Sequence, residues 1–149
     1  MKKEVKGRLI QAAIQASVNA FHPLTPVGVG AAVLTCDGDI FRGCNVQTTI
    51  SGLGVCAERC AIYSAVASGN YIFDAVAVYF PSQKFIKPCG VCLQLIYEFA
   101  EVADRDIHIL LINKDRRTRL TSVRRELKDA YGPRTAGKNI SPYLHNHHE

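Results

Sequence analysis

The sequence lacks any apolar run that approaches the ~18 residues needed to cross a bilayer. A mildly apolar stretch follows the charged start Met1–Lys6, but Gln11, Gln15 and Asn19 interrupt it at i, i+4, i+8 spacing. That spacing places the three amides on the polar face of an amphipathic helix, which is not the pattern of a signal peptide. We therefore expect a cytoplasmic protein with no membrane partner.

Internal repeats and low-complexity linkers are also absent. A chain of 149 residues, 48% of them hydrophobic, suits one domain with a real core. We therefore predict a single domain over residues 1–149, in which about 134–149 form a C-terminal tail without a clear pattern.

The charges are unbalanced but not sorted into blocks. Eighteen basic residues against 13 acidic ones give a net charge of +5. The densest group is Lys114–Arg119, followed by Arg124 and Arg125. A solvated turn and a helix face explain this group better than a nucleic-acid patch does, so a nucleic-acid partner is not expected.

The hydrophobic pattern alternates between helical and strand-like segments. Asp37-Gly38 is a hairpin signal, and His22-Pro23 and Gly69-Asn70 end helices. The expected elements are a helix over 4–21, strands over 27–34 and 40–46, a helix over 56–68, a strand over 71–80, a helix over 90–102, strands over 107–112 and 119–121, and a short helix over 122–130. This order predicts a three-layer α/β/α sandwich with a mixed sheet of about five strands.

Six cysteines without a secretion signal indicate thiol or metal chemistry rather than disulfides. Cys56 and the segment Pro88–Cys92 each stand where a loop becomes a helix, and Cys89 and Cys92 share one helical turn. If the strands over 71–80 and 107–112 are parallel neighbours, the three thiolates converge at one end of the sheet. Zinc suits such a site and becomes catalytic when the protein supplies only three ligands.

Glu58 follows Cys56 by two residues on a helix made largely of apolar side chains. A carboxylate there can reach the open position of the metal without ligating it, and can exchange protons with a water at that position. Arg59 can hydrogen-bond a ligand sulfur and so keep the metal Lewis-acidic.

Two plainer interpretations stay open. The Cys89/Cys92 pair alone would fit a redox motif, and a fourth cysteine would make a structural zinc site. We interpret the remaining cysteines as ordinary thiols, and we assign no catalytic role to the histidines of the tail: Cys36, Cys44 and Cys60; His145, His147 and His148.

These motifs resemble the cytidine deaminase family, in its small homotetrameric, three-cysteine branch. The resemblance runs from about Val29 to Pro133 and rests on five segments: Gly30–Thr35 with Asp37-Gly38, Gly43–Val46, Cys56–Arg59, Pro88–Cys92 and Ala130–Pro133. It implies hydrolytic, zinc-dependent deamination of cytidine or deoxycytidine to the uracil nucleoside and ammonia, in pyrimidine salvage.

The resemblance also implies the roles of individual residues. Cys56, Cys89 and Cys92 would hold one zinc ion per chain, and Glu58 would move the protons. Substrate contacts would come from Asn45 and Gln47 at the ribose, from the Ala57 backbone at the base, from Val27 in the pocket wall, and from Tyr131, contributed across an interface between chains.

Four positions depart from the family pattern. Gln47, Thr48, Val27 and Leu93 stand where the family has Glu, Asn, Phe and Arg. These departures leave the zinc segments intact but concern the substrate pocket. They motivate an alternative, a deaminase of a modified cytosine nucleoside of the blasticidin S type. A nucleic-acid-editing deaminase and a non-catalytic zinc protein are further alternatives.

Overall fold

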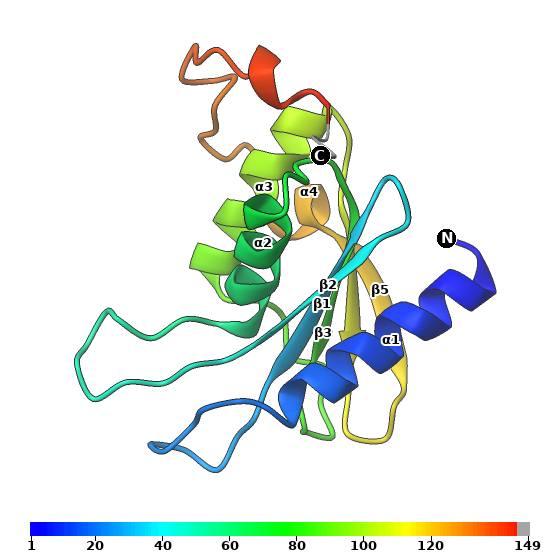
Figure 1. The fold of residues 1–149 in the computed structure, drawn as a ribbon, viewed down its shortest axis with the longest axis vertical. Helices are drawn as coiled ribbons and strands as arrows, with labels where there is room; N and C mark the ends of the chain where they lie inside the picture. The colour runs from blue at the N-terminus through cyan, green and yellow to red at the C-terminus, as the bar shows by residue number, and fades with distance from the viewer. Residues whose placement is uncertain (146–149) are drawn as a thin grey trace.

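A mixed five-stranded sheet in the order β2-β1-β3-β4-β5 forms the middle layer of the molecule (Figure 1). The computed structural model describes residues 1–145. The strands are β1 (Gly30–Thr35), β2 (Ile40–Cys44), β3 (Phe73–Tyr79), β4 (His108–Ile112) and β5 (Thr118–Ser122). The helices are α1 (Lys3–Ser17), α2 (Ala57–Ala67), α3 (Gly90–Ala103), the short α4 (Val123–Glu126) and a 3-10 turn η1 (Ser141–Tyr143).

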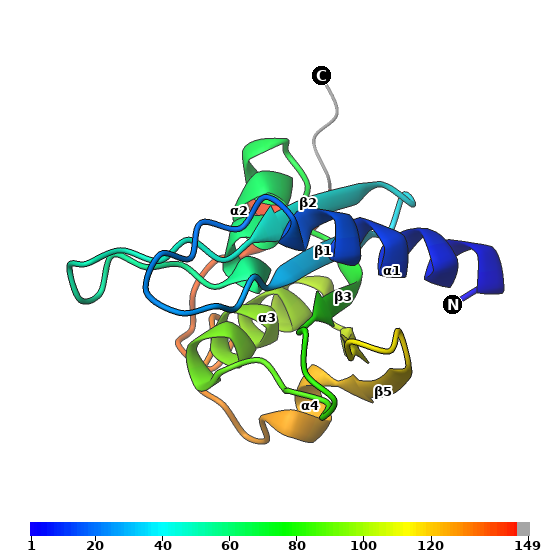
Figure 2. The same ribbon diagram turned by 90° about the horizontal axis from the view of Figure 1, so that it is seen from below.

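Helices cover both faces of this sheet. α1 lies on one face, while α2 and α3 lie together on the other (Figures 1 and 2). Leu9 and Ala13 of α1 pack with Leu110 of β4, whereas Ile62 of α2 and Ile96 of α3 pack on the opposite face. Every residue of β1 is consequently buried, as expected for a strand covered on both sides. The predicted three-layer α/β/α sandwich with a mixed sheet is confirmed.

β3 and β4 are parallel neighbours, with Ala75 opposite His108 and Tyr79 opposite Ile112. α2 leads into β3 and α3 leads into β4, so both helices run back along the sheet and begin at the same end of it. This arrangement meets the condition under which the three cysteines converge. No helix in the part of the chain that the structure describes is long and apolar enough to cross a membrane.

The first helix is shorter than the helix that the stripe of apolar residues in the sequence predicted. α1 ends at Ser17, and Phe21 instead lies extended beside the residues that follow β2. The N–H of Phe21 donates to the Asn45 carbonyl at 3.1 Å, and the N–H of Gln47 donates back to Phe21 at 2.7 Å. These bonds to a distant segment replace the helical ones, so the prediction of helix over 18–21 is wrong.

Two other boundaries also differ from the sequence prediction. The first strand begins at Gly30 rather than Val27, because residues 27–29 bond to the Asn45 side chain instead of a neighbouring strand. α4 ends at Glu126, since Leu127 is extended and Asp129 has a left-handed φ of 50°. The longer helix predicted over 122–130 therefore does not form.

Gly43 allows β2 to lie directly against the first turns of α2. A Cβ at this position would overlap backbone atoms of Ala57 and Ala61.

We expect Gly43→Ala to lower the free energy of unfolding by roughly 1–3 kcal/mol, because the added methyl group would force the backbone of β2 away from that of α2. Urea denaturation measures this, with Gly7→Ala as the control. Gly7 lies in α1 with open space around it, so its replacement should keep or raise stability. Equal midpoints for Gly43→Ala and the unmodified protein would contradict the close approach.

Candidate metal and catalytic site

The two helix starts on this face of the sheet bring three cysteine sulfurs together. Cys56 is the N-cap of α2 and Cys89 the N-cap of α3, both with extended backbone, and Cys92 lies in the first turn of α3. The Sγ atoms of Cys89 and Cys92 are 3.4 Å apart, those of Cys56 and Cys89 are 4.0 Å apart, and all three lie within 4.8 Å of one another. The Cys92 N–H donates to the Cys89 sulfur at 3.5 Å, which fixes the turn.

This geometry fits a tetrahedral zinc ion. Zn–S bonds of about 2.3 Å with tetrahedral angles place sulfurs about 3.8 Å apart, between the two distances found here. Within residues 1–145, no other Cys, His, Asp or Glu joins this group. Three protein ligands leave one coordination position for water or substrate, which is the arrangement of a catalytic site rather than a structural one.

The surroundings favour a thiolate at Cys56. A hydrogen bond from Cys92, together with one from Arg59, lowers the pKa of Cys56 to about 5. The hydrogen bond with Cys56, together with burial, raises the pKa of Cys92. The positive ends of α2 and α3 add to the stabilisation of negative charge.

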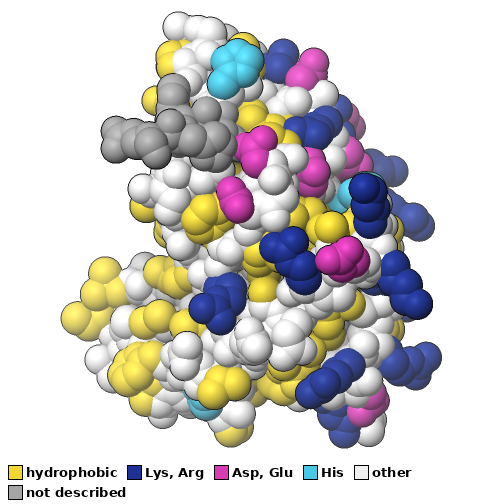
Figure 3. All heavy atoms as spheres, turned by 45° about the vertical axis from the view of Figure 1, so that its right-hand side comes forward, with side chains coloured by type: hydrophobic (Ala, Val, Ile, Leu, Met, Phe, Trp, Pro, Cys, Tyr) yellow, Lys and Arg dark blue, Asp and Glu magenta, His cyan; other side chains and the backbone are white. Residues whose placement is uncertain are grey.

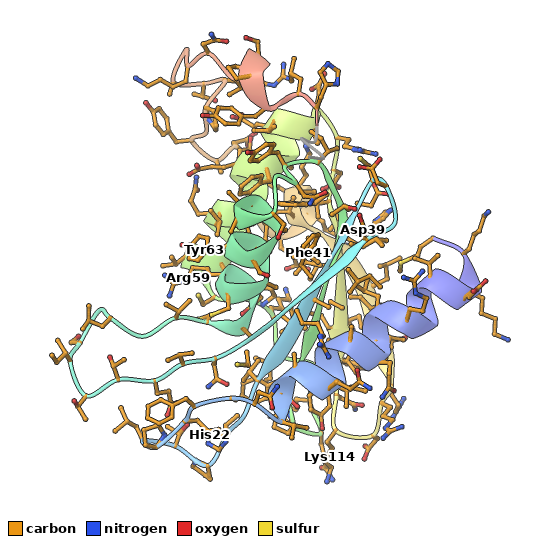
Figure 4. All side chains as sticks on the ribbon, viewed as in Figure 1. His22, Asp39, Phe41, Arg59, Tyr63 and Lys114 are labelled. Atoms are coloured by element: carbon orange, nitrogen blue, oxygen red, sulfur yellow. The ribbon has the colours of Figure 1, made fainter. Side chains whose placement is uncertain are left out.

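Arg59 lies in the first turn of α2, near Cys56. Its guanidinium donates to the Gly54 carbonyl at 3.2 Å, and its proximity helps to lower the pKa of Cys56. Figure 4 shows it on the outer side of α2, one turn before Tyr63. The guanidinium therefore connects the first turn of α2 to the loop that precedes it.

Glu58 points into a cavity beside the sulfurs. Only 5% of the residue is exposed, and this burial raises the pKa of its carboxyl group. The cavity has a volume of about 240 Å³ and is lined by Val29, Asn45, Cys56, Ala57, Glu58, Val78, Phe80, Ile86, Lys87 and Cys89. A buried carboxyl with a raised pKa next to a candidate metal site is suited to accept and return a proton.

The predicted substrate residues divide into two groups. Asn45 and Ala57 line the cavity, whereas Val27, Gln47 and Tyr131 do not. The Asn45 side chain accepts from the Val29 N–H at 2.7 Å and donates to the Val27 carbonyl at 3.2 Å. It therefore holds the segment 27–29 in place, and Val29 of this segment forms part of one wall of the cavity.

Gln47 bonds to the turn that precedes this wall. Its Oε1 accepts from the N–H groups of Leu24 and Thr25 at 3.1 and 3.2 Å, and its Nε2 donates to the Thr25 hydroxyl at 2.7 Å. Tyr131 is 69% exposed, and its carbonyl accepts from the Gln94 side chain at 2.6 Å. The structure thus presents Tyr131 on the surface rather than toward this chain's own cavity.

The remaining cysteines lie outside the three-thiol group. Burial raises the pKa of Cys60, and the thiol of Cys44 lies 3.5 Å from the Asn19 carbonyl. His145 is exposed, and His147 and His148 lie outside the described residues. Leu93 is buried in the core, so this departure from the family pattern serves packing.

Several cavity residues were missed by the sequence analysis. Phe80, Ile86 and Lys87 belong to the loop between β3 and α3, Val29 directly precedes β1, and Val78 lies in β3. The only local signal was that Lys87 stands two residues before Cys89. The others carry no chemical signature and become lining residues through the fold.

Known proteins resemble this chain in sequence and in fold. The family model described as the cytidine and deoxycytidylate deaminase zinc-binding region matches residues 3–105. A cytidine deaminase of Halalkalibacterium halodurans is 38% identical over 105 residues, which cover 70% of this chain and 77% of the relative. A blasticidin-S deaminase of Bacillus cereus is 40% identical over 80 residues, 48% of this chain and 57% of that relative. The crystal structure of a cytidine deaminase from Burkholderia pseudomallei superposes with a TM-score of 0.78 at 38% identity, covering 88% of this chain and 100% of that one.

Proposed function

Because the chain belongs to the cytidine and deoxycytidylate deaminase family, we propose that it hydrolyses the exocyclic amine of cytidine and deoxycytidine, releasing ammonia. The observation that carries this proposal is the buried Glu58 carboxyl beside three convergent sulfurs in one cavity. The proposal extends to a role in pyrimidine salvage in the cytoplasm.

In this proposal each residue has a defined task. Cys56, Cys89 and Cys92 would hold zinc, which when bound would supply a water of lowered pKa. Glu58 accepts a proton from the attacking water and delivers it to ring nitrogen N3 of the base. It then accepts the proton of the hydroxyl group newly formed on C4 and passes it to the departing amine, which leaves as ammonia. The Ala57 backbone orients the base, and Asn45 keeps the adjoining wall in place.

The test is an ultraviolet assay of the purified, zinc-loaded protein with cytidine, deoxycytidine and blasticidin S offered separately. Rapid turnover of cytidine or deoxycytidine is the expected result. A zinc-loaded protein that leaves both nucleosides unchanged would contradict the proposed substrates.

A modified cytosine nucleoside is the second candidate substrate. It is favoured by the hydrogen bonds of Gln47, whose carbonyl oxygen is already used by two backbone donors and is not available to a ribose hydroxyl. The similarity to a blasticidin-S deaminase points in the same direction. Turnover of blasticidin S without turnover of cytidine would establish this alternative.

We further propose that Gln47 acts mainly by positioning the turn at Leu24 and Thr25, with its remaining N–H directed to the substrate. Gln47→Ala removes three hydrogen bonds to this turn, so we expect KM to rise about tenfold while kcat changes by less than about threefold. Steady-state kinetics measure both constants. Thr25→Val keeps Gln47 but removes one acceptor, and should raise KM by a smaller factor. An unchanged KM for Thr25→Val would argue that Gln47 acts through substrate contact alone.

We also propose that the active sites are shared between chains of a homotetramer. Tyr131 is held outward by its bond from Gln94, and the next turn is fixed by the Arg134 N–H, which donates to the buried Glu101 carboxylate at 2.9 Å. Ile50 and Leu53, 65% and 60% exposed in the loop before α2, offer apolar surface for another copy.

Sharing predicts complementation between inactive variants. Tyr131→Ala and Glu58→Gln chains, each with low activity alone, should recover part of the unmodified activity after they are unfolded and refolded together. Activity assays measure the recovery, and native mass spectrometry measures the number of chains. Mixed assemblies that form without any recovery would place Tyr131 at its own chain's site.

A further inference from the structure

The excess positive charge of the chain is concentrated in two segments of the fold. Residues 81–88 and 113–119 hold six of the 18 basic residues and one of the 13 acidic ones. Their excess of five basic over acidic residues equals the whole net charge of +5, so basic and acidic residues are equal in number in the rest of the chain. All six basic residues are exposed, and we call them the basic surface: Lys84, Lys87, Lys114, Arg116, Arg117 and Arg119.

The tertiary structure joins these two segments, which lie about thirty positions apart in the sequence. The N–H of Lys114 donates to the Ser82 carbonyl at 2.9 Å, and the Arg119 guanidinium lies 5.1 Å from the centre of the Phe85 ring. The loop and the β4–β5 turn therefore form one continuous surface. Figure 3 shows many Lys and Arg side chains toward the right-hand side of this face, with Asp, Glu and apolar side chains among them.

The basic surface reaches the mouth of the candidate active site. Lys87 lines the same cavity as Glu58, and its Nζ lies 2.6 Å from Glu126 Oε2. Within residues 1–145 the other five basic side chains have no ion-pair partner. Lys114 projects from the lower end of the sheet in Figure 4, the end at which α2 begins. These five cations are available to an anionic ligand outside the protein.

We propose that the basic surface binds the phosphate backbone of single-stranded nucleic acid next to the cavity. Six exposed cations over a loop and a turn exceed what one phosphate group can contact, and they suit a chain of phosphates. Three of the six are arginines, whose planar guanidinium binds phosphate oxygens in pairs. Neither segment forms a helix that could lie in a lipid interface, so a flexible single strand fits better than a membrane.

A strand bound in this way passes the cavity mouth at Lys87. It should therefore slow the entry of free nucleosides, a consequence that rests on the proposed deaminase function. Binding itself does not depend on that function, and the two can fail separately.

The experiment measures fluorescence anisotropy of a labelled short oligothymidylate with the zinc-loaded protein as salt rises from about 50 to about 200 mM. We expect binding that weakens steeply with salt. The double variant Lys114→Glu/Arg117→Glu should bind at least about tenfold more weakly, and its salt slope should be smaller by about 1.4, or ~0.7 for each lost contact. Arg116 is left unchanged because its backbone has a left-handed φ of 59°.

The matched control is Lys3→Glu/Arg8→Glu, which makes the same change of charge on α1, away from the β4–β5 turn (Figure 1). With a Debye length of about 10 Å at 0.1 M salt, its effect should stay within about threefold. An equal loss of oligonucleotide affinity in both double variants would mean that binding depends only on the net charge of the protein, which would overturn the proposal. So would an absence of oligonucleotide binding, or binding to anionic lipid vesicles alone. Inhibition of cytidine turnover by the oligonucleotide, weakened only in Lys114→Glu/Arg117→Glu, is the expected second readout.

Discussion

Glu58→Gln is expected to lower kcat for cytidine by about 10²–10⁴-fold, the usual contribution of a positioned general acid–base group. The amide keeps the size of the side chain but cannot carry a proton between water, the base and the leaving amine. Zinc content should stay at the level of the unmodified protein, because Glu58 is not one of the three convergent side chains. Stopped assays with enough enzyme to detect slow turnover, together with metal analysis, measure both quantities.

The stability of Glu58→Gln provides an internal control. Burial raises the pKa of Glu58, so its ionised form is less stable in the folded chain than in the unfolded one. Glu58 therefore favours the folded state below its unfolded pKa, and this contribution is lost as pH rises through the folded pKa. We expect the metal-free variant to melt at or above the Tm of the metal-free unmodified protein at pH 7. Glu4→Gln, on exposed α1 surface, should leave kcat unchanged. A Glu58→Gln enzyme with nearly full kcat would remove Glu58 from the mechanism.

Cys89→Ala is expected to abolish both tight zinc binding and turnover. Removing one of three sulfurs leaves two protein ligands, fewer than catalytic zinc sites use. Metal content after dialysis should fall to less than about a tenth of the unmodified value, as measured by mass spectrometry of the metal. The lost cap of α3 should also lower Tm, because Cys89 accepts the Cys92 N–H.

Cys60→Ala is the matched variant for this experiment. Cys60 lies one turn beyond Cys56 on the same helix but outside the three-thiol group. It should keep its zinc and its turnover, since alanine also suits a helix interior. Equal loss of zinc from Cys60→Ala and Cys89→Ala would mean that the metal is held by a different set of thiols.

The sequence by itself determined which side chains meet at the candidate site. Cys56-Ala57-Glu58 and Pro88–Cys92 are short-range patterns, and their spacing at helix starts already specified three sulfurs and one carboxyl group. The order of strands and helices determined the layered architecture in the same way, because burial on both faces of a sheet leaves a continuous apolar signature in each strand. The predicted end of α1 was wrong because Phe21 continues the helical spacing of apolar residues, but its backbone hydrogen bonds are with Asn45 and Gln47 instead of with the helix.

Only the tertiary structure decided where the other functional side chains lie. Gln47 bonds to Leu24 and Thr25, which lie 23 and 22 positions away in the sequence. The low pKa of Cys56 depends on Cys92, which belongs to another helix. Residues 113–119 contain the densest basic group of the sequence, but only the fold places residues 81–88 beside them. Local propensity encodes periodicity and turns, whereas these contacts depend on which segments the packed sheet brings together, and a single sequence does not record that pairing.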